Sequence, residues 1–351
     1  MKRILNFFSS LKLTVILLSL SMFLIFFGTL DQVHYGIWHT QKLYFESFLV
    51  FWDYPDQAPA HNLLSWLHIP MPGGYLLGGL LLVNLLAAHS TRFKLNWKKS
   101  GIFLVHFGLL LLLLSELLTD LVSVESQMPV DEGSQSNYST AFRSNELAFI
   151  DRSHSEYDSV HTIPASLLKE GRIIPIPNTP LKIRTLAYYP NAEVGRASSD
   201  VSHQTMATRG VAIRMGIVAK PLPENYAEDD VNTATSFVEI YGPEGSLGIW
   251  LVSNVIDERF PPQIVESGDQ AWEIALRFTR HYYPFELELI DFTHDKYPGT
   301  EIPFNFSSEV IIRHQDSAKN QKALIYMNHP LRYEGITLSL IHISEPTRLT
   351  S

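Results

Sequence analysis

The chain of 351 residues contains no cysteine, and this absence removes several kinds of function from consideration. Without thiols there are no disulfides, no thiolate metal sites and no thiol redox chemistry. The net charge of −9 leaves no basic surface of the kind that binds nucleic acid. The sequence also lacks a glycine-rich phosphate loop, an HExxH motif and a G-x-S-x-G motif. No residue is therefore predicted to be catalytic, and the chain is not expected to be an enzyme by itself.

Charge is also nearly absent from three long apolar runs in the first 120 residues. The runs cover residues 11–30, 74–89 and 102–118. A helix of about 20 apolar residues crosses a hydrocarbon core of roughly 30 Å. We therefore predict transmembrane helices over about 11–30, 72–90 and 101–119. The first run is too long for the apolar part of a signal peptide, and no small-x-small cleavage site follows it, which indicates a retained anchor.

Lysine and arginine residues beside these runs indicate the orientation of the helices, because cytoplasmic ends carry an excess of them. They precede the first run and fill the link between the second and third, at Lys2, Arg3, Lys12, Arg92, Lys94, Lys98 and Lys99. Residues 31–71 contain one lysine, Lys42, among several acidic residues. We predict a cytoplasmic N-terminus, an outside loop over 31–71 and export of everything after Asp120. In a Gram-negative bacterium this topology describes a multi-pass inner-membrane protein with its large domain in the periplasm.

The predicted outside loop is rich in aromatic residues. Those nearest its centre are Tyr44, Phe45, Phe48, Phe51 and Trp52. On a helix they would lie on roughly one face, which suits a segment at the level of the lipid headgroups. Tyr and Trp are common at this interface, so we expect them to anchor the loop rather than to contact a ligand.

Residues 121–338 have the pattern of a β domain. Short segments rich in β-branched and aromatic residues alternate apolar and polar positions and are separated by Gly- and Pro-containing turns. The predicted strands are 211–218, 236–241, 247–252, 272–278, 285–292, 309–314 and 323–327. The polar stretches 187–210 and 221–235 are predicted to be loops. The predicted fold class is thus a membrane protein with three N-terminal transmembrane α-helices and an extracytoplasmic all-β domain of antiparallel, sandwich-like type.

Ionisable residues inside the apolar runs are candidates for function, because they are costly at membrane depth. His89 ends the second run and His106 lies early in the third, so both are predicted near the cytoplasmic leaflet. A neutral imidazole can be an axial ligand of haem iron. Alternatively, His89 extends toward the headgroups beside Arg92, and His106 makes a hydrogen bond between helices. Glu116 lies near the far end of the third run.

The remaining candidate residues lie in the predicted β domain, and none of them forms a recognisable motif. Loop-like sequence surrounds one group, which we expect to be solvated: His154, His161, His203, Glu224, Asp229 and Asp230. A second group lies in or beside predicted strands and is expected to have a structural role: His281, His294 and His329.

Several segments resemble one known family. Ser10-Leu-Lys-Leu-Thr-Val-Ile-Leu-Leu18, followed by Gly28-Thr29-Leu30, resembles the opening of the ResB/CcsB cytochrome c biogenesis proteins of System II. Further similar segments follow in the same order, at 84–89, 99–110, 297–300, 308–312 and 327–335. Each segment alone is a weak signal, but the ordered set is specific.

The resemblance implies a role in haem handling. Such proteins pair with a CcsA/ResC-type partner, and together they carry haem b across the membrane and assist its attachment to the thiols of apocytochrome c. The resemblance favours His89 as an axial ligand of the haem iron, keeps His106 as a second haem-binding candidate, and assigns the other axial ligand to the partner. The lack of cysteine agrees with this role, because the thiols belong to apocytochrome c. The chain would act within a holocytochrome c synthase complex.

Residues 339–351 depart from the resemblance. The family usually continues into a further transmembrane helix, whereas this segment is short and polar at its end. We expect a truncated reading frame with a non-native tail, and no role is assigned beyond Leu338.

Two other functions remain open. In the first, the three helices only anchor an extracytoplasmic binding or structural domain, and the membrane histidines are replaceable. In the second, Glu116 and His106 form a proton relay in a transporter subunit. The small number of predicted spans disfavours the second.

Overall fold

The computed structural model describes residues 2–53, 66, 68–92, 100–196, 205–225, 231–300, 303–314 and 319–340. The chain divides into two compact units, each described here by itself. The helical unit comprises Met1–Val124 and Pro223–Asn232, and the β unit comprises Glu125–Leu222 and Thr233–Ser351.

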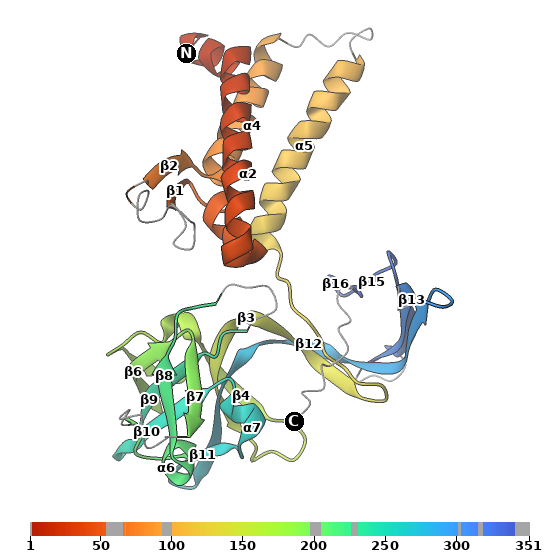
Figure 1. The fold of residues 1–351 in the computed structure, drawn as a ribbon. Helices are drawn as coiled ribbons and strands as arrows, with labels where there is room; N and C mark the ends of the chain where they lie inside the picture. The colour runs from red at the N-terminus through yellow and green to blue at the C-terminus, as the bar shows by residue number, and fades with distance from the viewer. Residues whose placement is uncertain are drawn as a thin grey trace. The chain divides into compact units, whose positions relative to one another are not determined.

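The helical unit consists of helices and one small hairpin (Figure 1). Its elements are α1 (Lys2–Phe8), α2 (Leu11–Thr40), the π-helical turn η1 (Gln41–Phe45), β1 (Leu49–Asp53), β2 (His68–Pro72), α4 (Gly74–Arg92) and α5 (Ser100–Val122). Three helices are long and apolar enough to cross a membrane, which confirms the three predicted helices. Because their outer surfaces are apolar and largely exposed, lipid is the solvent that suits them.

The first helix is longer than predicted. It continues about ten residues beyond Leu30, to Thr40, and runs directly into η1. Gly36 interrupts the regular helix, with φ 73° and ψ 162°. A positive φ of this kind is readily adopted by glycine and rarely by other residues.

The prediction that the aromatic residues after Thr40 share one helical face is wrong, because part of that segment is a strand. β1 pairs with β2 in antiparallel register from Leu49↔Pro72 to Asp53↔His68. Side chains alternate between the faces of a strand, so Trp52 is buried whereas Phe51 is exposed. Pro70 and Pro72 lie two residues apart on β2, so both lack a backbone donor on the same edge of the hairpin.

The β unit contains two main antiparallel sheets (Figure 1). Its elements are β3 (Gln135–Asp151), β4 (Ser159–Pro164), η3 (Ala165–Leu167), β5 (Ile173–Pro175), β6 (Lys182–Tyr189), β7 (Ala192–Arg196), α6 (Val211–Met215), β8 (Ile217–Pro221), β9 (Thr235–Gly242), β10 (Gly245–Ser253), α7 (Ile256–Arg259), β11 (Gln263–Ser267), β12 (Gln270–Lys296), β13 (Pro303–Arg313), β14 (Gln321–Tyr326), β15 (Leu331–Tyr333) and β16 (Ile336–Leu338). The first sheet has the order β10-β9-β6-β5. The second has the order β14-β13-β12-β3-β4, and β11 also pairs with β12.

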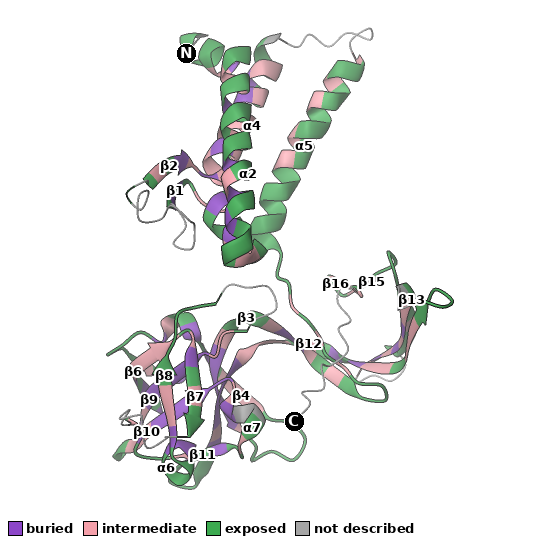
Figure 2. Ribbon diagram, viewed as in Figure 1, coloured by how far each residue is buried: buried purple, intermediate pink, exposed green. Residues whose placement is uncertain are grey.

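The two sheets share one hydrophobic core, which confirms the sandwich-like class. Leu147, Ile274 and Leu276 come from the second sheet, and Ile183 and Val238 come from the first. All five side chains are fully buried. Figure 2 shows buried residues on strands of both sheets. Alternate positions of each strand point into the core, as a sheet with one buried face requires.

The β12 strand extends beyond this core into a second, smaller one. The predicted strands 272–278 and 285–292 are parts of this one strand of 27 residues, which continues through register shifts in its pairing with β3. The smaller core, here called the distal core, contains Leu287, Val310 and Ile325, with Met128 and Val130 packed against it. β12 thus links the sandwich to a long ribbon formed with β13.

Two local predictions in the β unit are wrong. The segment 211–218 is not one strand, because Val211–Met215 forms α6 between two glycines that have positive φ, Gly210 and Gly216. The segment 187–210 is not all loop, because it contains the end of β6 and the short strand β7. Apolar composition alone does not distinguish a buried helical turn from a buried strand.

Candidate functional site

His89 and His106 lie side by side between α4 and α5. His89 is near the end of α4, and His106 is in the second turn of α5. Their ring centroids are 5.6 Å apart, with an angle of 63° between the ring planes. Phe103, one turn before His106, lies 5.8 Å from the His89 ring. The two predicted site residues are therefore at the same depth and in contact, and we call them the imidazole pair.

Hydrogen bonds within each helix define which nitrogen carries the proton. The Nδ1 atom of His89 donates to the carbonyl oxygen of Leu85 at 3.1 Å. The Nδ1 atom of His106 donates to the carbonyl oxygen of Ile102 at 2.8 Å. Because a carbonyl oxygen can only accept, each neutral ring carries its lone pair on Nε2. Metal-bound histidines commonly hold their second nitrogen in this way, so both rings fit the role of Nε2 ligand.

A buried asparagine fixes α4 near the imidazole pair. Asn84 accepts a hydrogen bond from the Thr14 hydroxyl at 2.7 Å. Its amide nitrogen donates to the carbonyl oxygens of Phe8, at 2.5 Å, and Ser10, at 3.3 Å. These bonds join α4 to α1 and α2 only five residues before His89. In lipid, polar contacts of this kind hold helices together where apolar surface gives no preference for protein over lipid.

A buried carboxylate at the other end of α2 was not predicted as a site. Asp31 accepts hydrogen bonds from the Tyr44 hydroxyl at 2.5 Å and from the Trp52 indole nitrogen at 3.2 Å. All three side chains are buried. The break at Gly36 and the turn η1 return the chain so that Tyr44 lies beside Asp31. The signal in the sequence is an aspartate directly after an apolar run, at the first position of the predicted outside loop.

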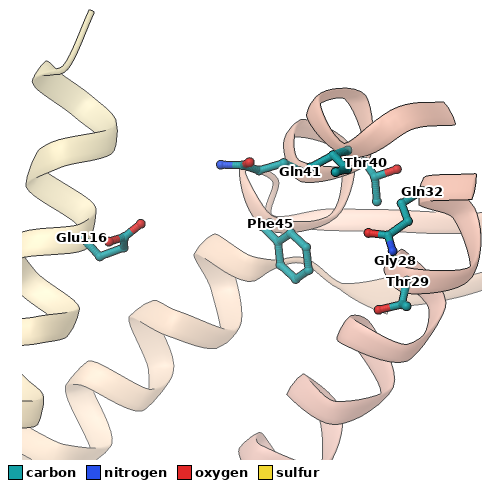
Figure 3. A pocket seen from close by; sticks show the side chains of 8 residues that line it. Gly28, Thr29, Gln32, Thr40, Gln41, Phe45 and Glu116 are labelled. Atoms are coloured by element: carbon teal, nitrogen blue, oxygen red, sulfur yellow. The ribbon is translucent and has the colours of Figure 1, made fainter. Parts of the chain in front are cut away.

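Glu116 lines a hollow of about 290 Å³ within the helical unit. The other lining residues come from α2 and η1: Gly28, Thr29, Gln32, Ile37, Thr40, Gln41 and Phe45. Figure 3 shows Glu116 extending from α5 on the side of Gln41 and Phe45. Ten residues separate Glu116 from His106, or about 15 Å along a helix. The two groups therefore do not form a direct relay, and the structure adds no support to the transporter alternative.

Several of the described histidines of the β unit pack on aromatic neighbours. His154 stacks on Tyr157, with ring centroids 4.6 Å apart, and His329 stacks on Tyr326 at 4.1 Å. His294 stacks on Phe306 at 4.4 Å. Among the described residues, no group of three or more His, Asp or Glu side chains is arranged to hold a metal ion. His203, Asp229 and Asp230 lie outside the described residues.

Hydrogen bonding shifts the pKa of a few groups in the β unit. The Tyr241 hydroxyl and the Ser246 hydroxyl both donate to the Glu239 carboxylate, which lowers its pKa. The same bond raises the pKa of Tyr241. The backbone N–H of Ser153 lowers the pKa of Asp151 in the same way. These shifts come from local turns and pairs of strands, and they do not mark a shared site.

Together, membrane-spanning helices with an imidazole pair and an antiparallel β unit define a membrane-anchored protein with a sandwich-like domain. Residues 262–349 match the model of the ResB-like family. This match confirms the resemblance found in the sequence, and it indicates a general role in cytochrome c biogenesis. No curated protein gives a significant sequence match.

The matched range covers β11 to β16 and continues to residue 349. It includes most of the segment 339–351 that we expected to be unrelated. Residues 341–351 lie outside the described residues, so that expectation stays a prediction. The helices that carry His89 and His106 lie before the matched range, and their relation to the family rests on the similar segments at 84–89 and 99–110.

Proposed function

We propose that the chain is the subunit of a System II cytochrome c maturation complex that receives haem b within the membrane. A CcsA/ResC-type protein is its partner, and apocytochrome c is the acceptor of the haem. The observation that carries the proposal is the imidazole pair, in which two rings within apolar helices carry a lone pair on the same nitrogen, Nε2, at the same depth. The ResB-like match supports the general process.

The geometry of the pair favours one axial ligand from this chain for each haem. The two axial ligands of an iron approach from opposite sides of a planar macrocycle. His89 and His106 are in ring contact, so a porphyrin does not fit between them as they are placed. One ring would therefore bind the iron from one side, and the partner would supply the opposite ligand. His89 is the better candidate, because Asn84 fixes its helix nearby.

The second imidazole then has a supporting role. His106 lies in contact with the ring of His89 and would limit its rotation. Phe103 borders His89 as well and gives the site an apolar wall. Haem itself supplies the redox-active iron when it is bound, while these residues orient the ligand and exclude water.

The proposed topology places the imidazole pair near the cytoplasm and the β unit in the periplasm. The distribution of Lys and Arg supports this orientation in the inner membrane. The β unit would then lie on the side where apocytochrome c receives haem.

Absorption spectroscopy of the co-purified complex tests the proposal. With the CcsA/ResC-type partner present, we expect the spectrum of low-spin haem. His89→Ala should strongly reduce the bound haem, His106→Ala should reduce it less, and added imidazole should restore the signal in His89→Ala. His34→Ala, which removes an exposed histidine of α2, is the matched control and should leave the spectrum unchanged. Unchanged spectra for both His89→Ala and His106→Ala would reject the haem-ligand role.

A further inference from the structure

The distal part of the β12–β13 ribbon has one aromatic face and one polar face. Beyond Leu289, β12 continues to Lys296 and remains paired with β13. The pairs Phe292↔Ser308 and His294↔Phe306 alternate with Thr293↔Ser307 and Asp295↔Asn305. Directly paired residues lie on the same face of a sheet and neighbouring pairs lie on opposite faces. We call the first set, formed by Phe292, His294, Phe304 and Phe306, the aromatic face.

The rings of the aromatic face pack on one another. Phe306 stacks on His294 with a centroid distance of 4.4 Å and on Phe292 with a distance of 6.4 Å. At the end of the ribbon, Tyr297 contacts Phe304 edge to face at 5.0 Å. Phe304 is 57% exposed and Tyr297 is 49% exposed. The ribbon thus presents ordered aromatic rings that are half uncovered.

The aromatic face continues the sheet face that carries the distal core. Leu289 pairs with Val310 on this face, two positions from the pairs that begin the aromatic stretch. At the base of the ribbon, Met128 and Val130 pack against the distal core. Figure 2 shows buried residues at the base and half-buried or exposed residues along the outer ribbon. The same apolar face is therefore covered at its base by the segment that follows α5 and is open farther out.

Chain length limits how far the first residues of the β unit can lie from the end of α5. α5 ends at Val122, and Gln127 already exchanges two backbone hydrogen bonds with Thr140 of β3. Ser126 is also bonded to Ser139, with 2.7 Å between the hydroxyl oxygens. Five residues from Val122 to Gln127 span at most about 18 Å when fully extended. The point at which the β unit is attached therefore stays within this distance of the end of α5, from which the ribbon can reach the bilayer surface.

We propose that the aromatic face lies in the lipid headgroup region and forms a second contact of the β unit with the membrane. Tyr297 at the end of the ribbon is of the type that is enriched in this region, and Phe side chains insert at the boundary between headgroups and acyl chains. The opposite face carries Asp291, Asp295 and Asn305, which would remain in water. Lys296 at the end of the ribbon suits the phosphate layer. Contact at both the α5 exit and the ribbon would restrict rotation of the β unit above the membrane.

The absence of cysteine from the chain allows a direct test with single spin labels. The full chain would carry a nitroxide at Phe304→Cys, in nanodiscs of phosphatidylcholine. Collision rates with oxygen, which enters lipid, and with a nickel chelate, which stays in water, report the surroundings of the label. Asn305→Cys, the next residue on the opposite face, is the matched control, and Glu244→Cys in the turn between β9 and β10 is a distant one.

We expect the label at Phe304 to favour oxygen over the nickel chelate several-fold, and both controls to favour the chelate. A label at Tyr297→Cys should give the same preference for oxygen as the label at Phe304→Cys. This agreement would show that the preference is not caused by one substitution alone. The proposal is overturned if labels at Phe304 and Asn305 give equal ratios. It is also overturned if the Phe304 label is shielded from both reagents, because protein rather than lipid would then cover the face. The test is independent of haem binding.

Discussion

The two units of the molecule each bury a carboxylate, and they satisfy it in different ways. In the helical unit, Asp31 accepts hydrogen bonds from the neutral donors of Tyr44 and Trp52. In the β unit, Glu146 accepts a hydrogen bond from the Arg277 guanidinium at 3.1 Å. At the end of the membrane helix the buried carboxylate is bound by a hydroxyl and an indole N–H, whereas between the strands it is bound by an arginine. Neutral donors cost less to desolvate than a second charge.

The units also differ in where they place apolar side chains. Among the described residues, α5 buries none of its side chains within the chain, whereas the β sandwich buries nearly every alternate position of its central strands. A membrane helix gains little from burying apolar surface, so polar contacts such as those of Asn84 determine how helices meet. The β unit depends on its core instead. We therefore expect that loss of a polar contact is the more destabilising kind of substitution in the helical unit, and that loss of a buried apolar side chain matters more in the β unit.

The largest effect is expected from removing the charge partner of the buried carboxylate in the β unit. Arg277→Met leaves Glu146 buried without its guanidinium and should destabilise the β unit by about 3–5 kcal/mol. The full chain in detergent micelles is suitable for this measurement. Hydrogen exchange of β3 and β12 peptides, followed by mass spectrometry, reports the change in local stability.

The double variant Glu146→Leu with Arg277→Met is the control for this prediction. It removes both charges and should recover most of the lost stability, because the cost arises from the unpaired carboxylate. Equal destabilisation in the single and double variants would show that the guanidinium acts through packing instead.

The second largest loss of stability is expected from substitutions in the two cores that β12 joins. Leu276→Ala removes a fully buried side chain from the sandwich core and should cost about 2–5 kcal/mol. Leu287→Ala, on the same strand, lies in the smaller distal core, which can relax around the change, and should cost less. Urea unfolding followed by exchange of the respective peptides measures both. A larger loss for Leu287→Ala would mean that the ribbon, not the sandwich, limits the stability of the unit.

Sequence patterns predicted the elements of the fold well where one residue property dominates. Uninterrupted apolar runs identified the three membrane helices, and period-two alternation identified strands such as β9 and β10. The end of α2 was misjudged because polar residues from Asp31 onward resemble a loop. Hydrogen bonds to Asp31 from Tyr44 and Trp52, which lie 13 and 21 residues later in the chain, make a helix acceptable there.

The same reasoning explains what was predictable about the candidate site. His89 and His106 stand out because imidazoles are rare inside apolar runs, and topology alone placed them at one depth. Their direct ring contact, and the carbonyl bonds that orient each ring, depend on helix packing and rotation. Their role as haem ligands stays a prediction. The aromatic face was not foreseen, because the pairing of β12 with β13 decides which residues share it.

A moderate effect is expected in the helical unit. Tyr44→Phe removes one donor from Asp31 and should destabilise the end of α2 by about 1–3 kcal/mol, the cost of leaving a buried acceptor partly unsatisfied. Hydrogen exchange of peptides from α2 and η1 in micelles measures the change. Tyr157→Phe, which alters an exposed tyrosine of the β unit, is the control and should have little effect. Unchanged exchange in Tyr44→Phe would mean that Trp52 alone satisfies the carboxylate.

The smallest effect concerns pH and the partly exposed carboxylate of Glu239. Hydrogen bonds from Tyr241 and Ser246 lower its pKa below the usual value of 4.5. A lowered pKa in the folded state means that the carboxylate stabilises the fold above pH 4.5 and that this contribution is lost as the pH falls through the lowered pKa. Glu239→Gln should therefore be slightly less stable than the unsubstituted chain at pH 6, and the difference should shrink at pH 3. Urea midpoints at the two pH values test this, and a difference that grows on acidification would contradict the direction of the shift. Solvent screens the Glu239 carboxylate, whereas the buried Asp31 carboxylate is screened far less. The change in stability should therefore be smaller for Glu239→Gln than for Tyr44→Phe.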